Sequence, residues 1–212
     1  MAVTLAPTSH RIVLDGIHWT TYQALIRDLE SEPHKRLTYN QGRLEIMVPL
    51  PPHERYKSLM GRLVEVTTEE SATEIASLGS TTWSREDLQK GLEADECFYI
   101  QNEQAVRGKD AIDLTVDPPP DLAIEVDNTQ SSLNRLEIYA AIGVPEVWRF
   151  DGKTLTIYRL IKDHYQPQEI STALPLLNRT DILRFLESSQ TMGETTWVRA
   201  FRQWIRSRLT EH

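Results

Sequence analysis

Alternating apolar and polar positions divide this chain into short strands and amphipathic helices, most clearly between residues 118 and 150. After three prolines, an apolar run at 122–126 has the length of a strand, residues 133–141 have helical spacing, and 146–150 form a second strand. A strand-helix-strand crossover is normally right-handed and joins parallel strands. We therefore expect the first turn of the helix to lie near the carboxyl end of the first strand.

The strand at 122–126 alternates in polarity, so its apolar side chains share one face and its carboxylates the other. The acidic residues on or beside it are Asp121, Glu125 and Asp127. Arg135 belongs to the early part of the following helix, close enough to reach Glu125 or Asp127. An ordinary buried strand does not carry such an acidic face, and this strand is therefore the first candidate for chemistry.

Further strands and helices are predicted around this unit. The spacing from Thr20 to Gln23 is that of a capping box, which predicts the start of a helix. The sequence Asn40-Gln41-Gly42 is typical of a hairpin turn. The expected elements are a strand at 11–14, a helix over 20–30, a hairpin over 36–50, a long helix over 53–72, short strands at 74–78, 80–83 and 95–100, a hairpin turn at 151–152, an edge strand at 164–170, and helices at 182–189 and 194–209.

Composition narrows the class of protein. With 212 residues, of which 40% are hydrophobic and 25% charged, the chain is expected to form a single globular domain over 1–212. It has no run of eighteen apolar residues and no signal-peptide pattern, so we expect a cytoplasmic protein without a membrane span. Cys97 is the sole cysteine, which excludes a disulfide framework and a thiolate zinc cluster and favours a small buried side chain.

The formal net charge of −8 argues against a surface built throughout for nucleic acid, because such binding depends on neutralising phosphates. A local basic face is available on the last helix, which carries Arg199, Arg202 and Arg206. Contact with nucleic acid is one interpretation of these arginines. The interpretation we favour is the solvated face of a terminal amphipathic helix.

Two acids on consecutive strands, Asp95 and Glu125, suggest a metal site. Carboxylates that converge from neighbouring strands can hold a hard divalent cation such as Mg²⁺, which takes few protein oxygens and keeps several waters. Such an ion polarises a phosphodiester and supplies a hydroxide. The residues alone leave an alternative open, in which Asp121, Glu125 and Asp127 are merely solvated at the end of a sheet, because short acidic motifs often match by chance.

A longer pattern resembles a known family. The run PPPDLAIEV followed by SSLNRLEIYAAIGVPEVWRFDGKTLTIYRL is similar to the core of the Uma-type restriction endonucleases, within the PD-(D/E)XK nuclease superfamily. The segments GRLEIMVPLPPHERYKSLMGRLV and EADECFYI resemble the hairpin, helix and first acidic strand of that family. The resemblance covers about residues 10–165 and leaves a C-terminal helical extension at about 176–210. It implies a mixed α/β fold of the restriction-endonuclease type, with a central mixed sheet flanked by helices, and Mg²⁺- or Mn²⁺-dependent hydrolysis of DNA.

By the same resemblance, Asp95 and Glu125 correspond to the metal ligands, and Asp127, Arg135 and His53 complete the candidate catalytic residues. Members of the superfamily place a lysine where this chain has Asp127, and the Uma-type family has a lysine where this chain has Arg135. Arginine keeps the positive charge but scarcely deprotonates. From the sequence we therefore expect Arg135→Lys to cleave as well as the wild type or better, and Arg135→Ala to be inactive.

Three further positions bear on the site. His53 precedes the long helix where the family also tends to have a histidine, and it could approach a metal-bound water or a phosphate. A capping or surface role is the alternative for this residue. Glu45 could lie near the same site, and Ala94 replaces the proline that usually precedes the first aspartate.

Three functions follow from these residues. The leading one is a metal-dependent endonuclease acting on DNA. The alternatives are a catalytically weak or inactive nuclease-fold protein that binds nucleic acid, and a phosphodiesterase acting on RNA or small substrates. An enzyme that cuts both strands usually needs two active sites related by a two-fold axis, so we expect a homodimer.

Overall fold

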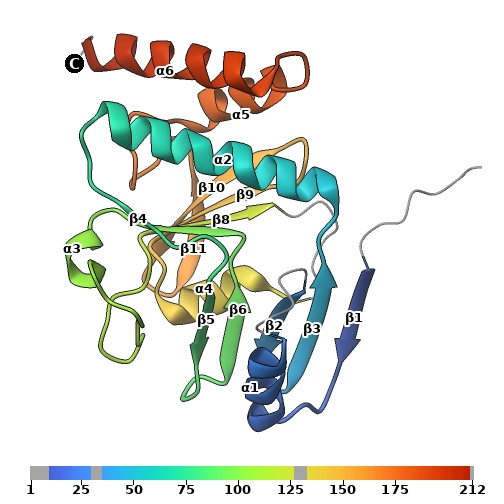
Figure 1. Cartoon of the computed structure of the whole chain (residues 1–212). Coiled ribbons are helices and arrows are strands. Elements are labelled where there is room, and N and C mark those ends of the chain that lie inside the picture. Colours follow the sequence, from blue (N-terminus) through green and yellow to red (C-terminus); the bar gives the residue numbers. More distant parts are fainter. Residues whose placement is uncertain (1–9, 30–34, 127–132, 211–212) are drawn as a thin grey trace, which may run out of the picture.

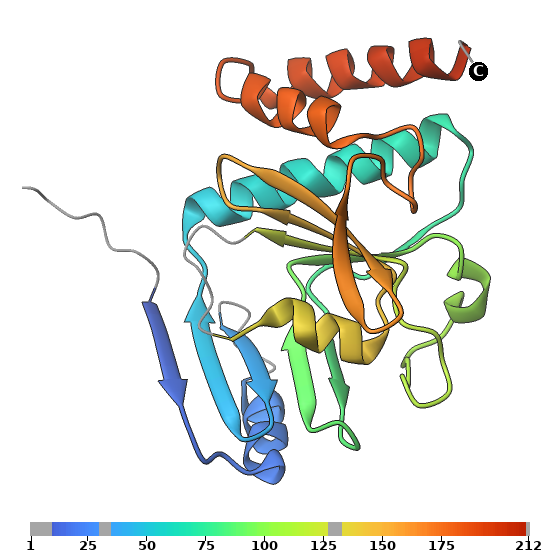
Figure 2. The same cartoon turned by 180° about the vertical axis from the view of Figure 1, so that it is seen from behind.

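The computed structural model describes residues 10–29, 35–126 and 133–210 and folds them around two β-sheets (Figures 1 and 2). The strands of the larger sheet are β4 (Ala76–Ser77), β7 (Glu96–Tyr99), β8 (Leu122–Val126), β9 (Glu146–Phe150), β10 (Leu155–Ile161) and β11 (His164–Gln168), in the order β11-β10-β9-β8-β7-β4. The strands of the smaller sheet are β1 (His10–Leu14), β2 (Arg36–Asn40), β3 (Arg43–Val48), β5 (Thr82–Arg85) and β6 (Lys90–Glu93), in the order β1-β3-β2-β6-β5. Because β8 and β9 are parallel and the other pairs of the larger sheet antiparallel, this sheet is mixed, as predicted.

Helices cover both faces of the larger sheet. The helices of the described chain are α1 (Trp19–Asp28), α2 (Pro51–Glu70), α3 (Glu103–Val106), α4 (Arg135–Ile142), α5 (Arg179–Ser188) and α6 (Glu194–Thr210). In Figure 1, α2 lies on one face with α5 and α6 beyond it, and α4 lies on the opposite face. The mixed α/β fold with a C-terminal helical extension is thus confirmed, and α1 covers the smaller sheet.

The predicted strand-helix-strand unit is present as β8, α4 and β9. The parallel register pairs Leu122 with Glu146, and Gly143 ends α4 in the left-handed conformation, with φ of 92°. Asn134 caps the helix, and its side chain accepts a hydrogen bond from the Glu137 backbone N–H. The alternation along β8 also holds, because Ile124 packs in the core under α2 while Ala123 packs against α4. Glu125 therefore faces α4.

The predicted strand at 11–14 and hairpin over 36–50 are present as β1, β2 and β3, but their assembly into a separate smaller sheet was not predicted. The strands β4 and β5 were predicted as successive strands of one region, whereas they belong to different sheets, and β6 was not predicted. The capping box at Thr20 was wrong, because α1 begins at Trp19 after His18, which makes no side-chain capping hydrogen bond. Pairing of strands from distant parts of the chain decides which sheet each strand joins, and a local pattern carries no signal for this pairing.

The last helix packs along α2 through an apolar stripe. Trp197, Phe201 and Ile205 are fully buried, and Arg202 and Arg206 form ion pairs with α2. These two arginines are thus held by acidic side chains, which corrects the expectation of a merely solvated basic face. No helix of the described segments is long and apolar enough to cross a membrane.

Candidate active site

Asp95 directly precedes β7, and Glu125 lies on the neighbouring strand β8 of the larger sheet. The last registered pair of β7 and β8 joins Glu96 to Ile124, and Asp95 and Glu125 are the next residues beyond that pair. The backbone N–H of Val126 donates a hydrogen bond of 2.8 Å to Asp95 Oδ2. The two acids are only 2% and 6% exposed and line the same small cavity. Both acids are therefore buried and convergent, and the alternative of solvation at a sheet end is excluded for Glu125.

His53 is attached to Asp95 from the first turn of α2. Its Nε2 lies 3.0 Å from Asp95 Oδ2, and its Nδ1 lies 3.2 Å from the carboxylate of Glu54. Burial opposes the charged form of the imidazole, but the hydrogen bond and negative charge of Asp95 outweigh it and raise the pKa of His53. Burial would raise the pKa of Asp95, yet the hydrogen bond from His53 holds it below its usual value. His53 is thus neither a capping nor a surface residue.

Arg135 and Tyr139, one turn apart on α4, both donate hydrogen bonds to the same oxygen of Glu125. Arg135 Nη2 lies 2.6 Å from Glu125 Oε1, and the Tyr139 hydroxyl donates to that oxygen as well. Arg135 Nη2 also lies 2.6 Å from the Glu93 carbonyl oxygen, and Nη1 donates to the Thr38 hydroxyl. Arg135 therefore connects the carboxylate of the larger sheet to two strands of the smaller one.

The charge states around Glu125 follow from burial. Burial raises the pKa of Glu125, and the positive charge of Arg135 offsets only part of this rise. Burial and the neighbouring carboxylate raise the pKa of Tyr139 well above its usual value, so the phenol stays a neutral donor. Burial alone would lower the pKa of Arg135, but Glu125 raises it overall. Arg135 is consequently a permanent cation and not a proton acceptor.

The cavity between these residues is small, at about 20 Å³, which is room for about one water molecule. Its lining residues are Arg11, Arg36, Glu45, Met47, Glu93, Asp95, Glu125, Val126 and Arg135. Glu45 is 3% exposed and pairs with Arg11, so its predicted place near the site is confirmed. The sequence analysis missed Arg11, Arg36 and Glu93, because an isolated charged residue on a short strand does not reveal which cavity it faces.

One other acid of the predicted strand, Asp121, stands apart from this cavity. Asp121 is 4% exposed and accepts hydrogen bonds from the backbone of Ile100 and from both the backbone and side chain of Asn102. It stabilises the turn that follows β7 and is not part of the site. Asp127 lies outside the described residues. Cys97 is fully buried, as predicted, and burial raises the pKa of its thiol to about 12.

The cavity offers a hard metal ion only a few protein ligands. Among the described residues, no group of three or more His, Cys, Asp or Glu side chains is arranged to hold a metal. Mg²⁺, however, is often bound through one or two carboxylates with water in its remaining positions. The buried oxygen donors of Asp95 and Glu125 meet that requirement in type and number.

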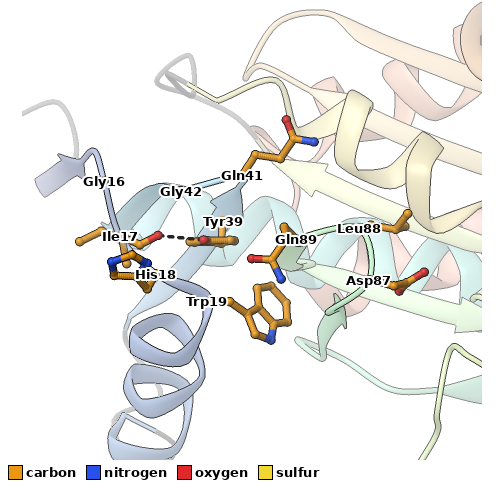
Figure 3. A pocket seen from close by; sticks show the side chains of 10 residues that line it. All are labelled: Gly16, Ile17, His18, Trp19, Tyr39, Gln41, Gly42, Asp87, Leu88 and Gln89. Carbon is orange, nitrogen blue, oxygen red and sulfur yellow. Dashed lines mark hydrogen bonds between the residues drawn. The ribbon is translucent and has the colours of Figure 1, made fainter.

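A second hollow lies at the opposite end of the β2-β3 hairpin and has a volume of about 500 Å³ (Figure 3). Trp19 and Tyr39 form part of its wall, and the Tyr39 hydroxyl donates a 2.8 Å hydrogen bond to the carbonyl of Ile17. The carboxylate in its lining is Asp87, which pairs with Arg85. Because this hollow has no convergent acids, the cavity beside Asp95 and Glu125 is the better candidate.

Comparison with known proteins identifies the family of this chain. No curated protein matches the chain. A crystal structure from Anabaena variabilis, described as a "putative nuclease belonging to DUF820", is similar over 70% of this chain and 89% of that chain, with 14% sequence identity and a TM-score of 0.49. The family model Uma2, described as "Putative restriction endonuclease", matches residues 19–191. The chain therefore belongs to the Uma2 family of restriction-endonuclease-like proteins.

Proposed function

We propose that this protein is a metal-dependent endonuclease that hydrolyses DNA phosphodiester bonds. The observation that carries the proposal is the buried, neighbouring pair of Asp95 and Glu125, each hydrogen-bonded to a basic side chain, His53 or Arg135. Burying two carboxylates side by side is costly unless counter-charges compensate them. Membership of a nuclease family supports hydrolysis of a nucleic acid as the use of such a pair.

Asp95 and Glu125 are the residues that would hold Mg²⁺ or Mn²⁺. When bound, such an ion polarises the phosphodiester and lowers the pKa of a water molecule. His53 fixes the orientation of the Asp95 carboxylate through its Nε2, and Tyr139 and Arg135 fix that of Glu125. The protein thus holds its two acidic side chains in one conformation before substrate arrives.

His53 and Arg135 have different chemical capacities. His53 lies between the carboxylates of Asp95 and Glu54, and its imidazole is a group that can accept and release a proton. Arg135 remains protonated and can only offer hydrogen bonds and positive charge. Arg135 therefore takes over the charge of the family's lysine but not its capacity to accept a proton. Asp127, at the superfamily's lysine position, remains a catalytic candidate from the sequence.

A second candidate function is nucleic-acid binding without cleavage. The observation that favours it is the engagement of Arg135, whose guanidinium already contacts Thr38, Glu93 and Glu125. A guanidinium whose Nη1 and Nη2 are both bonded inside the protein has fewer donors left for a substrate. Hydrolysis of RNA or small phosphodiesters at the same cavity is the third possibility.

A cleavage assay on supercoiled plasmid with Mg²⁺ or Mn²⁺ separates these functions. We expect the wild type to nick or cut the plasmid, Asp95→Asn and Glu125→Gln to lose at least a hundredfold in rate, and Asp163→Asn, an exposed acid, to match the wild type. Binding without cleavage would favour the second candidate. Faster hydrolysis of RNA or of bis(p-nitrophenyl) phosphate than of DNA would favour the third.

The proposal includes a homodimer if the enzyme cuts both strands, because one active site serves one strand at a time. Sedimentation equilibrium with and without duplex DNA measures the mass of the complex. A monomer that only nicks would agree with the nuclease proposal but not with the dimer.

A further inference from the structure

Arg36 is a buried cation of the cavity with an unsatisfied donor. It is 5% exposed on β2, and its Nε is buried without a hydrogen-bond partner within the described part of the chain. The Nε of Arg135, across the same cavity, is also buried and unpaired there. Buried N–H groups are nearly always paired, so two such donors at one cavity indicate a missing acceptor.

The other contacts of Arg36 place it between the helix and the strands of the site. Its Nη1 donates to the Glu93 carboxylate, its Nη2 lies 3.9 Å from Glu54, and its Nε lies 4.0 Å from Asp95. A separation of 4.0 Å is an electrostatic contact but not a hydrogen bond. Arg36 is therefore anchored at one end of its guanidinium and leaves the Nε edge beside the acidic pair.

The charge of the cavity depends on its occupancy. Three arginines and four carboxylates line it, which is a formal excess of one negative charge when every carboxylate is ionised. A divalent cation on Asp95 and Glu125 would turn this into an excess of one positive charge. The arginines then lack a full set of counter-ions, and an anion beside them is favoured.

The size of the cavity limits what can enter. A volume of about 20 Å³ accepts a single oxygen atom or water molecule, not a whole oxyanion. A phosphate can insert one non-bridging oxygen while the rest of the group stays outside. Arginine is the side chain best suited to such an oxygen, because its planar fork matches phosphate geometry.

We propose that Arg36 and Arg135 form an oxyanion subsite that binds one non-bridging oxygen of a phosphate group next to the acidic pair. The phosphate can belong to a DNA strand or be free inorganic phosphate. Only the first source rests on the proposed nuclease function. Arg36 is a phosphate-binding residue in this assignment, and Glu93 is its positioning residue.

Calorimetry with inorganic phosphate tests the subsite without requiring cleavage. We expect the wild type to bind phosphate at least tenfold more tightly in Mg²⁺ than without it. Arg36→Gln should lose at least tenfold in phosphate affinity while its Mg²⁺ affinity stays equal or rises, because a counter-ion of Asp95 is gone. Arg43→Gln, on the same hairpin and paired to Asp15 at the surface, is the matched control and should keep the affinity of the wild type.

Arg36→Lys distinguishes a loss of phosphate binding from a folding defect of Arg36→Gln. It keeps the charge but lacks the Nε edge, and should show an intermediate phosphate affinity with a native circular dichroism spectrum. Equal phosphate affinity in the wild type, Arg36→Lys and Arg36→Gln would overturn the subsite, as would a lack of phosphate binding by the wild type in Mg²⁺.

Competition with a short DNA duplex shows whether the phosphate of this subsite belongs to DNA or is free inorganic phosphate. If DNA supplies it, a short duplex should compete with inorganic phosphate in Mg²⁺, and Arg36→Gln should raise KM for cleavage more than it lowers kcat. Phosphate binding that depends on Arg36 in a protein that cleaves no DNA would retain the subsite and reject the nuclease. Cleavage with an unchanged KM in Arg36→Gln would retain the nuclease and reject the subsite for DNA.

Discussion

Arg135 joins the Glu125 carboxylate to the smaller sheet, because its Nη2 lies 2.6 Å both from Glu125 Oε1 and from the Glu93 carbonyl oxygen. Arg135, which occupies the position of the family's lysine, thus also links the two sheets through hydrogen bonds. The Thr38 hydroxyl accepts a third hydrogen bond from the same guanidinium. A change at this position affects the packing of the fold and the orientation of the acid together.

The first prediction reverses the expectation from the sequence for Arg135→Lys. An ammonium is a compact point donor and cannot reach Thr38, Glu93 and Glu125 at once, so a buried acceptor is left unpaired. We expect a loss of about 1–3 kcal/mol in the free energy of unfolding, measured by urea titration, and slower cleavage than in the wild type. Arg62→Lys, at the surface of α2, is the control. Wild-type stability together with faster cleavage would restore the sequence-based view.

The second prediction concerns Glu146, a buried acid outside the site. It is 1% exposed and accepts hydrogen bonds from Trp148, Gln168, Ser171, Thr172 and Ala173. Gln places an amide group against these donors and should cost about 1–3 kcal/mol of stability.

Denaturant unfolding of Glu146→Gln measures this cost. Glu169→Gln removes a neighbouring exposed carboxylate and should change stability little. An equal effect of the two substitutions would show that the hydrogen bonds to Glu146 are not what holds the segment after β11.

The third prediction is a pH dependence of the α2–α6 contact. The hydrogen bonds of Arg206 and Arg202 lower the pKa of Glu70 below its ordinary value. A depressed pKa in the folded state adds stability above the ordinary carboxyl pKa, and this stability is lost as the pH falls through the folded value. Glu70→Gln should therefore have a lower Tm than the wild type at pH 7.

The difference in Tm between the wild type and Glu70→Gln should shrink on acidification and vanish once Glu70 is protonated in the folded protein. Thermal melts at several pH values between 7 and 2.5 follow it. Arg199→Gln, an exposed position on α6, is expected to show no such pH-dependent difference. A gap that stays constant down to the lowest pH would exclude ionisation of Glu70 as its cause.

The fourth prediction concerns Gly91, which lets Tyr22 approach β6. A Cβ at Gly91 would lie 2.3 Å from the Tyr22 hydroxyl, and Tyr22 is fully buried and stacked on Tyr39 at 4.8 Å. Gly91→Ala should destabilise the protein by about 1–3 kcal/mol through overpacking. Gly193→Ala, with no atom within 4 Å of the added Cβ, should be close to neutral. Equal melting temperatures for the two variants would mean that Tyr22 relaxes at little cost.

The sequence by itself determined the local elements and their order in the central unit. Periodicity located β8, α4 and β9, and the glycine at Gly143 marked the end of the helix, because these signals depend on residues only a few positions apart. The same patterns predicted that Arg135 would lie close enough to reach Glu125 or Asp127. This relationship lies within one crossover.

Only the tertiary structure decided which distant residues complete the site. His53 and Asp95 are 42 positions apart, Arg36 and Glu93 are 57 apart, and Arg135 and Thr38 are 97 apart. Such contacts arise from pairing of distant strands within the smaller sheet and from packing of α2 and α4 against the sheets, and the energy that selects this arrangement is spread over many non-local contacts. The sequence therefore predicted the acidic pair, whereas Arg36 and the cavity depend on how the two sheets meet.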